Sequence, residues 1–514
     1  MSNIRHALTI KREDDFAKWY QEVIAAADLA EESGVRGCMV IKPWGYGIWE
    51  RIQRLMDDRI KAAGVQNCYF PLFIPLANFT REAEHVEGFA KEMAVVTHHR
   101  LISDGKGGLI PDPAAMLEEP LVVRPTSETI IGDAMARWIQ SWRDLPLLTN
   151  QWANVVRWEM RTRMFLRTSE FLWQEGHTAH ENREDALAET HRALEMYRAC
   201  AEEDLALPVI AGEKPENERF PGAVETWSIE AMMQDGKALQ AGTSHYLGTN
   251  FAHAAGIQYQ DREGSQQYCH TTSWGVSTRL IGGVIMTHGD DDGLRVPPAI
   301  APQQIVIIPM LREAPEDAEL IAYCESLRAA LAGETALGER VRVLLDVKPG
   351  KAASKRWDWV RKGAPVIIEV GPRDMAEGKI AVLRRDQLWN TANGKPAFTY
   401  PAHGEFTAGA GALLADIQHA LFEEARVRRD ANITRGLTEW QQVADHFEQG
   451  GKYPGWVEVE WAKPTGETLE KVVEKLKAVK LTIRNVPREA AAASGTCIFT
   501  GAPAVERILV ARAY

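Results

Sequence analysis

The fold is constrained most by strand-like segments in the first 300 residues that are not regularly interleaved with helices. They alternate apolar with polar residues or carry many β-branched and aromatic side chains, and they span 121–123, 154–159, 225–231 and 273–278. Parallel neighbours need a long crossover, usually a helix, whereas antiparallel neighbours do not. We therefore expect a mostly antiparallel sheet flanked by helices, which makes this part of the chain α+β.

Helices are expected on both sides of the first strands. Residues 14–32 and 47–63 each place apolar side chains at helical spacing along one face. Gly64 is expected to end the second of these helices, because glycine readily adopts the left-handed conformation found after a helix. Residues 67–73 then read as a strand, and 129–142 as a further helix.

The rest of the chain divides into two smaller units. The expected boundaries are 1–300 for the first unit, 303–425 for the second and 431–514 for the third. Strands and helices alternate in the second unit, which indicates an α/β domain, at 304–308, 318–331, 341–345, 365–370, 379–383 and 411–426. The third unit is expected to be a small α+β domain with elements at 438–449, 456–461, 468–479, 481–484 and 507–511.

Composition argues against several classes of protein. No run of about 18 apolar residues occurs, so no membrane-spanning helix is expected, and the N-terminus lacks the apolar core of a signal peptide. The six cysteines are scattered without a CxxC pair, which favours free thiols and a cytoplasmic location. The net charge of −12 argues against nonspecific nucleic-acid binding, although residues 348–373 hold seven Lys or Arg and only two Asp or Glu.

Two arginines stand where a nucleotide site can form, although phosphate-loop and dinucleotide fingerprints are absent. In VVRWE, alternation places Arg157 and Glu159 on one sheet face, where they can clamp a phosphate and an adenine amino group. A cross-strand ion pair is the alternative interpretation. Arg279 precedes the pair Gly282–Gly283, and its guanidinium can hold a terminal phosphate or simply begin a helix.

Two further segments carry small polar groups. In RPTSE, Thr126 and Glu128 can cap the following helix, or the carboxylate can bind an ammonium or imino group. In QAGTSH, Gln240 and Thr243 can contact phosphate, ribose or metal-bound water. His245 can contact a small ligand, although a structural histidine is the alternative.

The segment FLWQEGH places three side chains on one face of a strand. Trp173, Glu175 and His177 alternate along it, so all three point the same way. They can form the wall of a small-molecule pocket with an aromatic surface and a polar rim. Packing within the core is the alternative.

Together these segments resemble the class II aminoacyl-tRNA synthetases, specifically the prolyl-tRNA synthetases of the archaeal/eukaryote-like type. VVRWEMRTRMFLRTSEFLWQEGHTAH is similar to the second class II motif, and TTSWGVSTRLIGGVIMTHGDDDGL to the third. RPTSETI resembles the proline-reading loop, and residues 67–75 with the preceding helix resemble the first motif, which forms a dimer interface. The similarity runs over nearly all of residues 14–430.

The resemblance implies ATP-dependent ligation of L-proline to tRNA(Pro) through prolyl-adenylate. Proline would be bound by Thr126, Glu128, Arg157 and His245, with Trp173, Glu175, His177 and Ser273 as pocket walls and Phe89 closing over them. ATP would be bound by Arg157, Glu159, Leu166, Thr168, Gln240, Thr243, Ser277 and Arg279. Arg157 and Arg279 would be the catalytic residues, and Mg²⁺ would bridge the phosphates near Glu159 or Gln240.

Partners follow from the same resemblance. The second unit is similar to the family's anticodon-binding domain, so the basic stretch 348–362 is expected to meet tRNA, with Trp357 and Trp359 either stacking on it or packing against the protein. A homodimer is expected. Tyr514, at the C-terminus, is expected near the active site, as in relatives that end in tyrosine.

Two departures from the family pattern have consequences. The interval from Arg157 to Arg279 leaves no room for the editing domain that extended bacterial members insert, so proofreading of mischarged alanine in cis is not expected. Related C-terminal domains often bind zinc through four cysteines, whereas Cys497 is the only cysteine after residue 430. A structural zinc site normally has four ligands, so we expect no zinc and a hydrophobically packed remnant.

Two alternatives remain open at this point. A related synthetase for another small amino acid, such as threonine or glycine, would differ in the pocket around Glu128, Trp173 and His177. A catalytically silent tRNA-binding regulator on the same fold would be expected to lack Arg157 or Arg279, and both are present.

Overall fold

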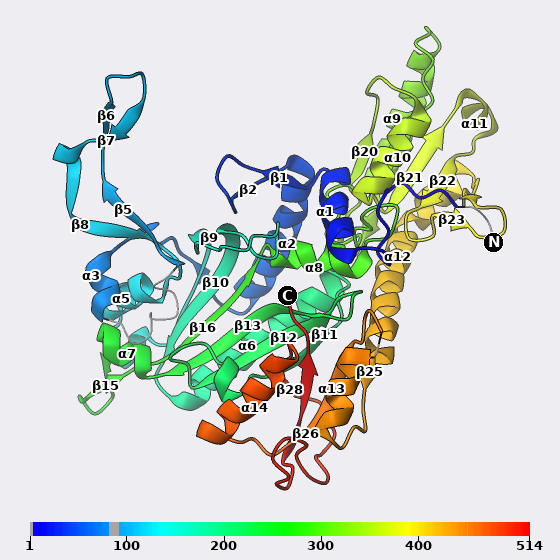
Figure 1. Cartoon of the computed structure of the whole chain (residues 1–514). Helices are drawn as coiled ribbons and strands as arrows, with labels where there is room; N and C mark the ends of the chain where they lie inside the picture. Colours follow the sequence, from blue (N-terminus) through cyan, green and yellow to red (C-terminus); the bar gives the residue numbers. More distant parts are fainter. Residues whose placement is uncertain (1–3, 82–91, 450) are drawn as a thin grey trace.

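The core of the molecule is an eight-stranded sheet in the order β28-β11-β12-β13-β16-β10-β9-β3. The computed structural model describes residues 4–81, 92–449 and 451–514 (Figure 1). Neighbouring strands are antiparallel except β3 and β9, which confirms the expected type of sheet. The strands are β3 (Gln66–Asn67), β9 (Leu147–Val156), β10 (Glu170–His180), β11 (Val209–Glu213), β12 (Glu225–Met232), β13 (Ala238–Gly248), β16 (His270–Ser277) and β28 (Val486–Pro487).

Helices bury one face of this sheet, and the helices over 128–138 and 250–255 pack beside Ala179 of β10 at one end of the other face. Trp274 on β16 and Tyr197 on a helix meet in the main core, together with Trp19 and Ile48. The small β14 (Gln258–Gln260) and β15 (Gln266–Tyr268) form a separate hairpin. The helices around the sheet are α1 (Phe16–Ala26), α2 (Pro43–Ala62), α5 (Glu128–Trp138), α6 (Arg183–Ala199), α7 (Asn250–Ala255) and α8 (Arg279–His288).

Several elements end earlier than the sequence pattern predicted. The predicted strand 154–159 stops in the ladder at Val156, because beyond it the Arg157 and Trp158 amides donate to Ser169 and Glu92 carbonyls. The predicted helix 14–32 ends at Ala26, because Asp28 has a φ of +57° and residues 30–32 form strand β1. The period of the side chains continues past these ends, so alternation alone does not locate them.

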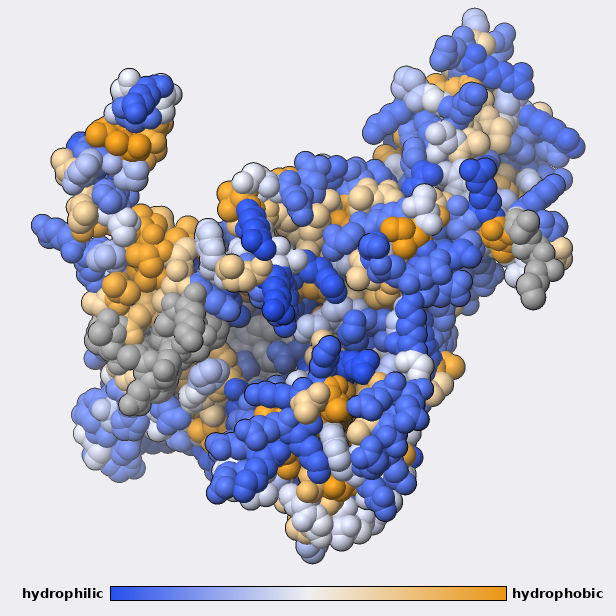
Figure 2. Space-filling model, in the orientation of Figure 1, coloured by the Kyte–Doolittle hydropathy of each residue, from blue (hydrophilic) through white to orange (hydrophobic). Residues whose placement is uncertain are grey.

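The predicted strand 67–73 divides into two, and a projecting arm follows it. β3 joins the large sheet, whereas β4 (Phe73–Pro75) pairs with β8 (Met116–Val123) in a sheet that includes β5 (Ala94–His98). The arm continues into the hairpin of β6 (Leu101–Ser103) and β7 (Leu109–Pro111), which extends away from the body in Figure 1. Apolar side chains on this arm are exposed, among them Val95, Leu101, Leu109 and Met116. Figure 2 shows orange patches on the projecting arm.

The second unit is an α/β sandwich around a four-stranded sheet ordered β20-β17-β21-β22. Alternate residues of β17 point to opposite faces, so Ile305 and Ile307 pack under two helices while Val306 and Ile308 pack under a third. Its elements are β17 (Ile305–Pro309), α9 (Asp317–Gly333), β20 (Val343–Leu345), α10 (Ala352–Lys362), β21 (Val366–Val370), α11 (Pro372–Glu377), β22 (Ala381–Arg384) and α12 (His403–Ala431).

The C-terminal unit has its own sheet and also adds a strand to the large one. Its sheet has the order β25-β26-β29-β27 and is covered by two helices. Strand β28 leaves this unit and pairs with β11 at the edge of the large sheet. The elements are β25 (Ile433–Thr434), α13 (Trp440–Gln449), β26 (Trp456–Trp461), α14 (Gly466–Ala478), β27 (Thr482–Ile483) and β29 (Glu506–Ala511).

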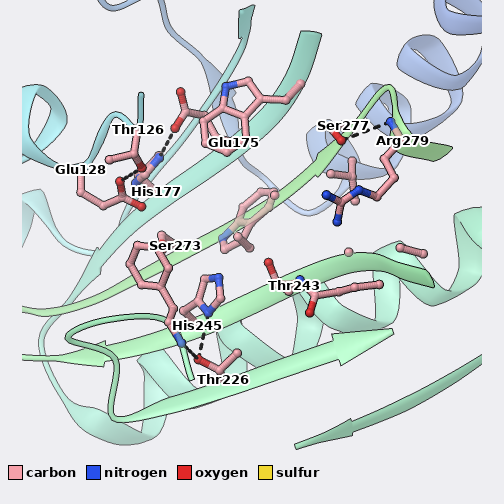
Figure 3. A pocket seen from close by; sticks show the side chains of 18 of the residues that line it. Thr126, Glu128, Glu175, His177, Thr226, Thr243, His245, Ser273, Ser277 and Arg279 are labelled. Atoms are coloured by element: carbon pink, nitrogen blue, oxygen red, sulfur yellow. Dashed lines mark hydrogen bonds and ion pairs between the residues drawn. The ribbon is translucent and has the colours of Figure 1, made fainter. Parts of the chain in front are cut away.

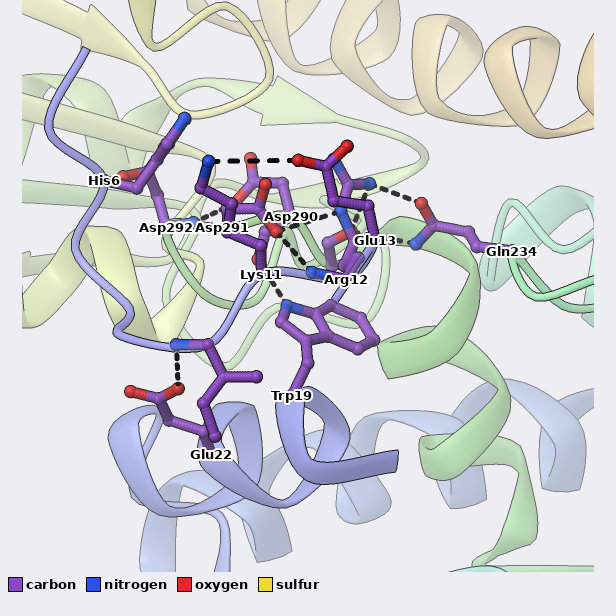
Figure 4. A network of polar contacts seen from close by, with 12 residues as sticks. His6, Lys11, Arg12, Glu13, Trp19, Glu22, Gln234, Asp290, Asp291 and Asp292 are labelled. Atoms are coloured by element: carbon purple, nitrogen blue, oxygen red, sulfur yellow. Dashed lines mark hydrogen bonds and ion pairs between the residues drawn. The ribbon is translucent and has the colours of Figure 1, made fainter. Parts of the chain in front are cut away.

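Three consecutive aspartates after α8 hold the N-terminal segment and the second unit together (Figure 4). Asp290 pairs with Arg385 of the second unit, and its carbonyl accepts a hydrogen bond from Trp19 at 2.9 Å. The carboxylates of Asp291 and Asp292 accept hydrogen bonds from the backbone amides of Arg12 and Ala7, at 3.0 and 2.8 Å. Each carboxylate therefore has donors. No helix in the described residues combines the length and the hydropathy needed to cross a membrane.

Candidate active site

Four strands, β10, β12, β13 and β16, present polar side chains to a cavity of about 250 Å³ on the face of the large sheet that is opposite the main core. Strand β16 shows how the sequence achieves this, because Ser273 and Ser277 line the cavity while the side chain of Trp274 packs in the core on the other side. Figure 3 shows the cavity side chains converging from several strands and from the start of α5. The alternating pattern of these strands thus separates a core face from a binding face.

Twelve of the residues expected at the site line this cavity: Thr126, Glu128, Arg157, Trp173, Glu175, His177, Gln240, Thr243, His245, Ser273, Ser277 and Arg279. Three more line an adjoining cavity of about 280 Å³ that shares Arg157, Ser277 and Arg279 with the first: Glu159, Leu166 and Thr168. Phe89 lies outside the described residues. Fifteen positions from four separated segments are thus brought to one continuous site.

A buried carboxylate organises the floor of the cavity. Glu175 accepts hydrogen bonds from Ser127 Oγ and Gln151 Nε2, both at 2.6 Å, and contacts His177 Nε2 at 2.8 Å. All four side chains are buried. Burial lowers the pKa of His177, but the hydrogen bond and charge of Glu175 outweigh it and leave that pKa above its usual value. The pair therefore favours an imidazolium bound to a carboxylate.

The RPTSE loop supplies the adjacent wall. The Thr126 hydroxyl donates to the Glu128 carboxylate, and Arg157 Nε donates to the Pro125 carbonyl at 2.9 Å. The Arg157 guanidinium lies 5.7 Å from the ring centroid of Trp173, within the range of a cation–π contact. These contacts fix Arg157 between the carboxylate wall and an aromatic surface. In this position the guanidinium lines the cavity, where it can meet an anionic ligand.

Positive charge concentrates at the other end of the cavity. Burial, and then the charges of Arg167 and Arg157, lower the pKa of Arg279 to about 10. Arg279 remains protonated at neutral pH, and an anion placed among the three guanidinium groups would relieve their mutual repulsion. Arg279 is held by a hydrogen bond from its Nε to the Leu166 carbonyl at 3.2 Å. This end of the cavity is suited to phosphate.

The middle of the cavity is neutral and contains unused hydrogen-bonding atoms. Burial, with the nearby His177, lowers the pKa of His245 to about 3, so its ring is neutral and contacts Thr226 Oγ1 at 3.1 Å. Among the described residues, Ser273 Oγ and Trp173 Nε1 are buried without a hydrogen-bond partner. Buried polar atoms are normally paired, so a polar ligand is the natural partner here.

Glu159 and Gln240 suit a magnesium ion that arrives with phosphates. Mg²⁺ usually binds one or two protein oxygens and completes its shell with water and substrate phosphate. Glu159 supplies a carboxylate near Arg279; it accepts a hydrogen bond from the Arg161 amide at 2.7 Å and lies 3.8 Å from the Arg167 guanidinium. Within the described residues, no three His, Cys, Asp or Glu side chains gather as a preformed metal site.

Sequence reasoning missed several residues that shape the cavity. Ser127 and Gln151 hold Glu175, while Phe171 and Phe220 add aromatic walls. Gln151 lies six residues before Arg157, and Phe171 two before Trp173, so strand alternation could have placed both on the binding face. For Phe220, which comes from a loop, no such periodic signal exists.

The C-terminal unit reaches the loop after β9. The Tyr514 hydroxyl donates to Asp235 at 2.6 Å, and the Arg163 guanidinium lies 5.7 Å from the Tyr514 ring centroid. Arg163 belongs to the segment that separates β9 from β10. Cys497 is buried in the apolar core of the C-terminal unit beside Trp461.

The basic stretch of the second unit is largely committed to contacts within the protein. Trp359 Nε1 donates to Asp346 at 2.9 Å, and the ring of Trp357 lies 5.7 Å from that of Trp389. Both tryptophans are partly buried and pack against the core of the second unit. Lys348 and Lys351 are exposed and free to face a polyanion.

Comparison with known proteins places this geometry in a family. Residues 115–288 match the model of the tRNA synthetase class II core domain (G, H, P, S and T), and residues 304–391 match that of an anticodon binding domain. A proline–tRNA ligase from Erythrobacter litoralis is 75% identical over 514 residues, covering 100% of both chains. One from Novosphingobium aromaticivorans is 73% identical over 99% of both.

A solved structure has the same fold over almost the whole chain. The crystal structure of prolyl-tRNA synthetase from Cryptosporidium parvum, complexed with L-proline and AMP, has a TM-score of 0.87 and 34% sequence identity. The match covers 99% of this chain and 97% of the other. With full-length relatives at such identity, a class II core and an anticodon-binding domain, this chain belongs to the prolyl-tRNA synthetase family of class II aminoacyl-tRNA synthetases.

Proposed function

We propose that this chain ligates L-proline to tRNA(Pro) in two steps, using ATP and passing through prolyl-adenylate. The observation that carries the proposal is one continuous site with a carboxylate wall at one end and three arginines at the other. A secondary ammonium ion fits the first end and a triphosphate the second. The Cryptosporidium parvum enzyme, of the same fold, was solved with L-proline and AMP.

The proline half is assigned to the residues around Glu175. Thr126, Glu128, Arg157 and His245 bind the amino acid, and Trp173, Glu175, His177 and Ser273 form the walls. Glu128 faces the positive imino group, while the unpaired Ser273 Oγ and Trp173 Nε1 offer polar contacts. Phe89, outside the described residues, stays in the proposal as a covering side chain. A pocket built for this shape would disfavour threonine or glycine.

The nucleotide half is assigned to the arginine end. Glu159, Leu166, Thr168, Gln240, Thr243, Ser277 and Arg279 bind ATP, and Arg157 contacts both substrates. Arg157 and Arg279 are the catalytic residues, because they neutralise charge that moves between phosphates. Mg²⁺ would be held by Glu159 or Gln240 and would supply additional neutralisation of the phosphates.

The chemistry needs positioning more than proton transfer. A proline carboxylate oxygen attacks the α-phosphorus of ATP, the bond to the β-phosphate oxygen breaks, and pyrophosphate leaves. The terminal ribose hydroxyl of tRNA then attacks the adenylate carbonyl, and AMP leaves. The carboxylate is already ionised, so the first step requires no general base. Each well-placed arginine contributes about 3–4 kcal/mol to transition-state stabilisation, by analogy with oxyanion-hole donors.

Partners and organisation complete the proposal. The units are 1–300, 303–425 and 431–514, and the second binds the anticodon arm, with Lys348 and Lys351 as exposed cations. A homodimer in the cytoplasm is proposed. Its interface would include the segment 67–75, where Tyr69 and Phe73 are exposed. Residues 183–268 are occupied by α6, α7 and strands β11 to β15, which supports the absence of an editing domain and hence of proofreading in cis.

The test is amino-acid-dependent exchange of pyrophosphate into ATP, without tRNA, across all twenty amino acids. We expect exchange with proline that is lost in Arg157→Ala. Arg161→Ala, in an exposed position of the same loop, is the control and should keep most of the exchange. Exchange with threonine or glycine but not proline would assign the chain to another specificity. A folded protein that binds tRNA without any exchange would be a silent regulator.

A further inference from the structure

A buried group of charges joins the C-terminal unit to the nucleotide side of the sheet. Glu230 on β12 is 0% exposed, and it is contacted by Lys214 from beyond β11 and by Arg484 from beyond β27. Arg484 Nε and Nη2 lie 3.1 and 2.8 Å from Glu230 Oε2, while Lys214 Nζ lies 2.8 Å from Oε1. Ser228 Oγ donates to Oε1 at 3.0 Å. Glu230 therefore depends on these donors for compensation of its buried charge.

The position of Glu230 in the sheet connects it to the ATP site. In the register of β12 and β13, Glu230 lies opposite Gln240, and Ser228 lies opposite Thr243. Directly opposed residues on neighbouring strands share a face and are in contact range. Gln240 and Thr243 line the cavity at the nucleotide half. A shift of Glu230 would therefore move the side chains that meet the nucleotide.

The C-terminal unit also contacts the turn of the β12–β13 hairpin. Ala513 forms a parallel bridge with Ala238 at the start of β13, and the Tyr514 hydroxyl donates to Asp235 at 2.6 Å. Strand β28, which begins two residues after Arg484, pairs with β11 next to β12. Asn485, 0% exposed, donates to the Ile210 carbonyl at 3.0 Å. The hairpin of β12 and β13 is thus held at its turn, its middle and its neighbouring strand.

We propose that Arg484 is a positioning residue for ATP. Through Arg484, the C-terminal unit fixes the position of the β12–β13 hairpin, which carries part of the nucleotide site. The inference rests on the function proposed above, and it gives the C-terminal unit a part in catalysis beyond stability. Arg484 itself does not line the cavity, so it acts through Glu230 and Gln240. Loss of Arg484 removes two charge-assisted hydrogen bonds and leaves Glu230 with Lys214 and Ser228 only.

The test compares Arg484→Met, Ser228→Ala and the wild type in proline-dependent exchange. For Arg484→Met we expect the KM for ATP to rise about tenfold, the size of one lost charge-assisted hydrogen bond, while the KM for proline changes less than about twofold. Ser228→Ala should shift the KM for ATP in the same direction but less. Arg484→Lys, which keeps the charge, should restore part of the affinity for ATP.

Arg295→Met is the matched control. Arg295 is also buried, and it makes a two-point contact with Glu424 at 2.8 and 2.7 Å between the first and second units. The Arg295→Met variant should have a lower melting temperature than the wild type and an unchanged KM for ATP. If Arg484→Met behaves in the same way, or if both KM values rise together, Arg484 is merely structural and the proposal is wrong.

Direct binding separates failure of the inference from failure of the function. Calorimetric titration with a non-hydrolysable ATP analogue measures the nucleotide site without any exchange reaction. Wild-type exchange with an unchanged analogue affinity in Arg484→Met would refute the inference and leave the function standing. Weaker analogue binding in Arg484→Met, with no proline exchange in the wild type, would support the inference and refute the function. If Arg484→Met does not fold, Ser228→Ala and Glu230→Gln decide the question by the same measurement.

Discussion

Gln151 is the residue through which the floor of the proline pocket can be perturbed most cleanly. Its Nε2 donates to Glu175 at 2.6 Å, and its Oε1 accepts the Phe70 amide at 3.0 Å from the segment between β3 and β4. Gln151→Leu keeps the volume and removes both bonds, together with a longer one of 3.3 Å from Nε2 to Ser127 Oγ. One lost bond to a charged group costs about 1.5–3 kcal/mol, and one unpaired buried amide about 1–3 kcal/mol.

We therefore expect Gln151→Leu to destabilise the protein by roughly 3 kcal/mol and to raise the KM for proline about tenfold, with the KM for ATP little changed. The pocket effect arises because Glu175 keeps only Ser127 and His177 as partners. Urea unfolding measures the first quantity, and pyrophosphate exchange at varied proline and ATP measures the second.

Gln174 provides the control. It precedes Glu175 on β10, so its side chain lies on the face of the sheet opposite to that of Glu175 and Gln151. It is 0% exposed, and it joins Asn150 and Tyr197 through bonds of 2.7 and 2.6 Å. Gln174→Leu should cost similar stability and leave the KM for proline unchanged. If both variants change the KM for proline equally, or if neither does, the assignment of Gln151 to the pocket floor is refuted.

Three further predictions concern packing, pH and metal. Gly176→Ala would place a Cβ 2.2 Å from ring carbons of the buried Trp274, so we expect at least about 1–3 kcal/mol of destabilisation in urea unfolding, against almost none for Gly34→Ala. Burial lowers the pKa values of His245 and His288 to about 3. The unfolded chain takes up these protons below about pH 6.5 while the folded chain does not, so each residue should remove about 1.4 kcal/mol of stability per pH unit as the pH falls from 6.5 towards 4. His288→Gln should flatten this dependence of the free energy of unfolding on pH. An unchanged slope would contradict the assignment of the effect to His288. Elemental analysis should find no stoichiometric zinc, and a zinc chelator should leave exchange intact, whereas removal of Mg²⁺ should abolish it.

The sequence by itself determined the chemistry of the site and the class of the fold. Residues such as Arg157, Glu175 and Arg279 lie in short segments whose alternation already separates a polar face from an apolar one. A period of two is a local property, so it can be read without knowing which strands are neighbours. The family resemblance then added roles to positions that the alternation had only placed on a face.

Only the tertiary structure decided which segments meet. Strand β28 joins the large sheet from a different unit, and Arg484 reaches Glu230 across 254 positions of chain. Likewise, the ladder ends at Val156 because amides beyond it bond to Ser169 and Glu92 carbonyls. Such pairings depend on burial and hydrogen bonding between distant segments. Local periodicity carries no information about them, because a strand edge can accept any backbone that tertiary packing brings to it.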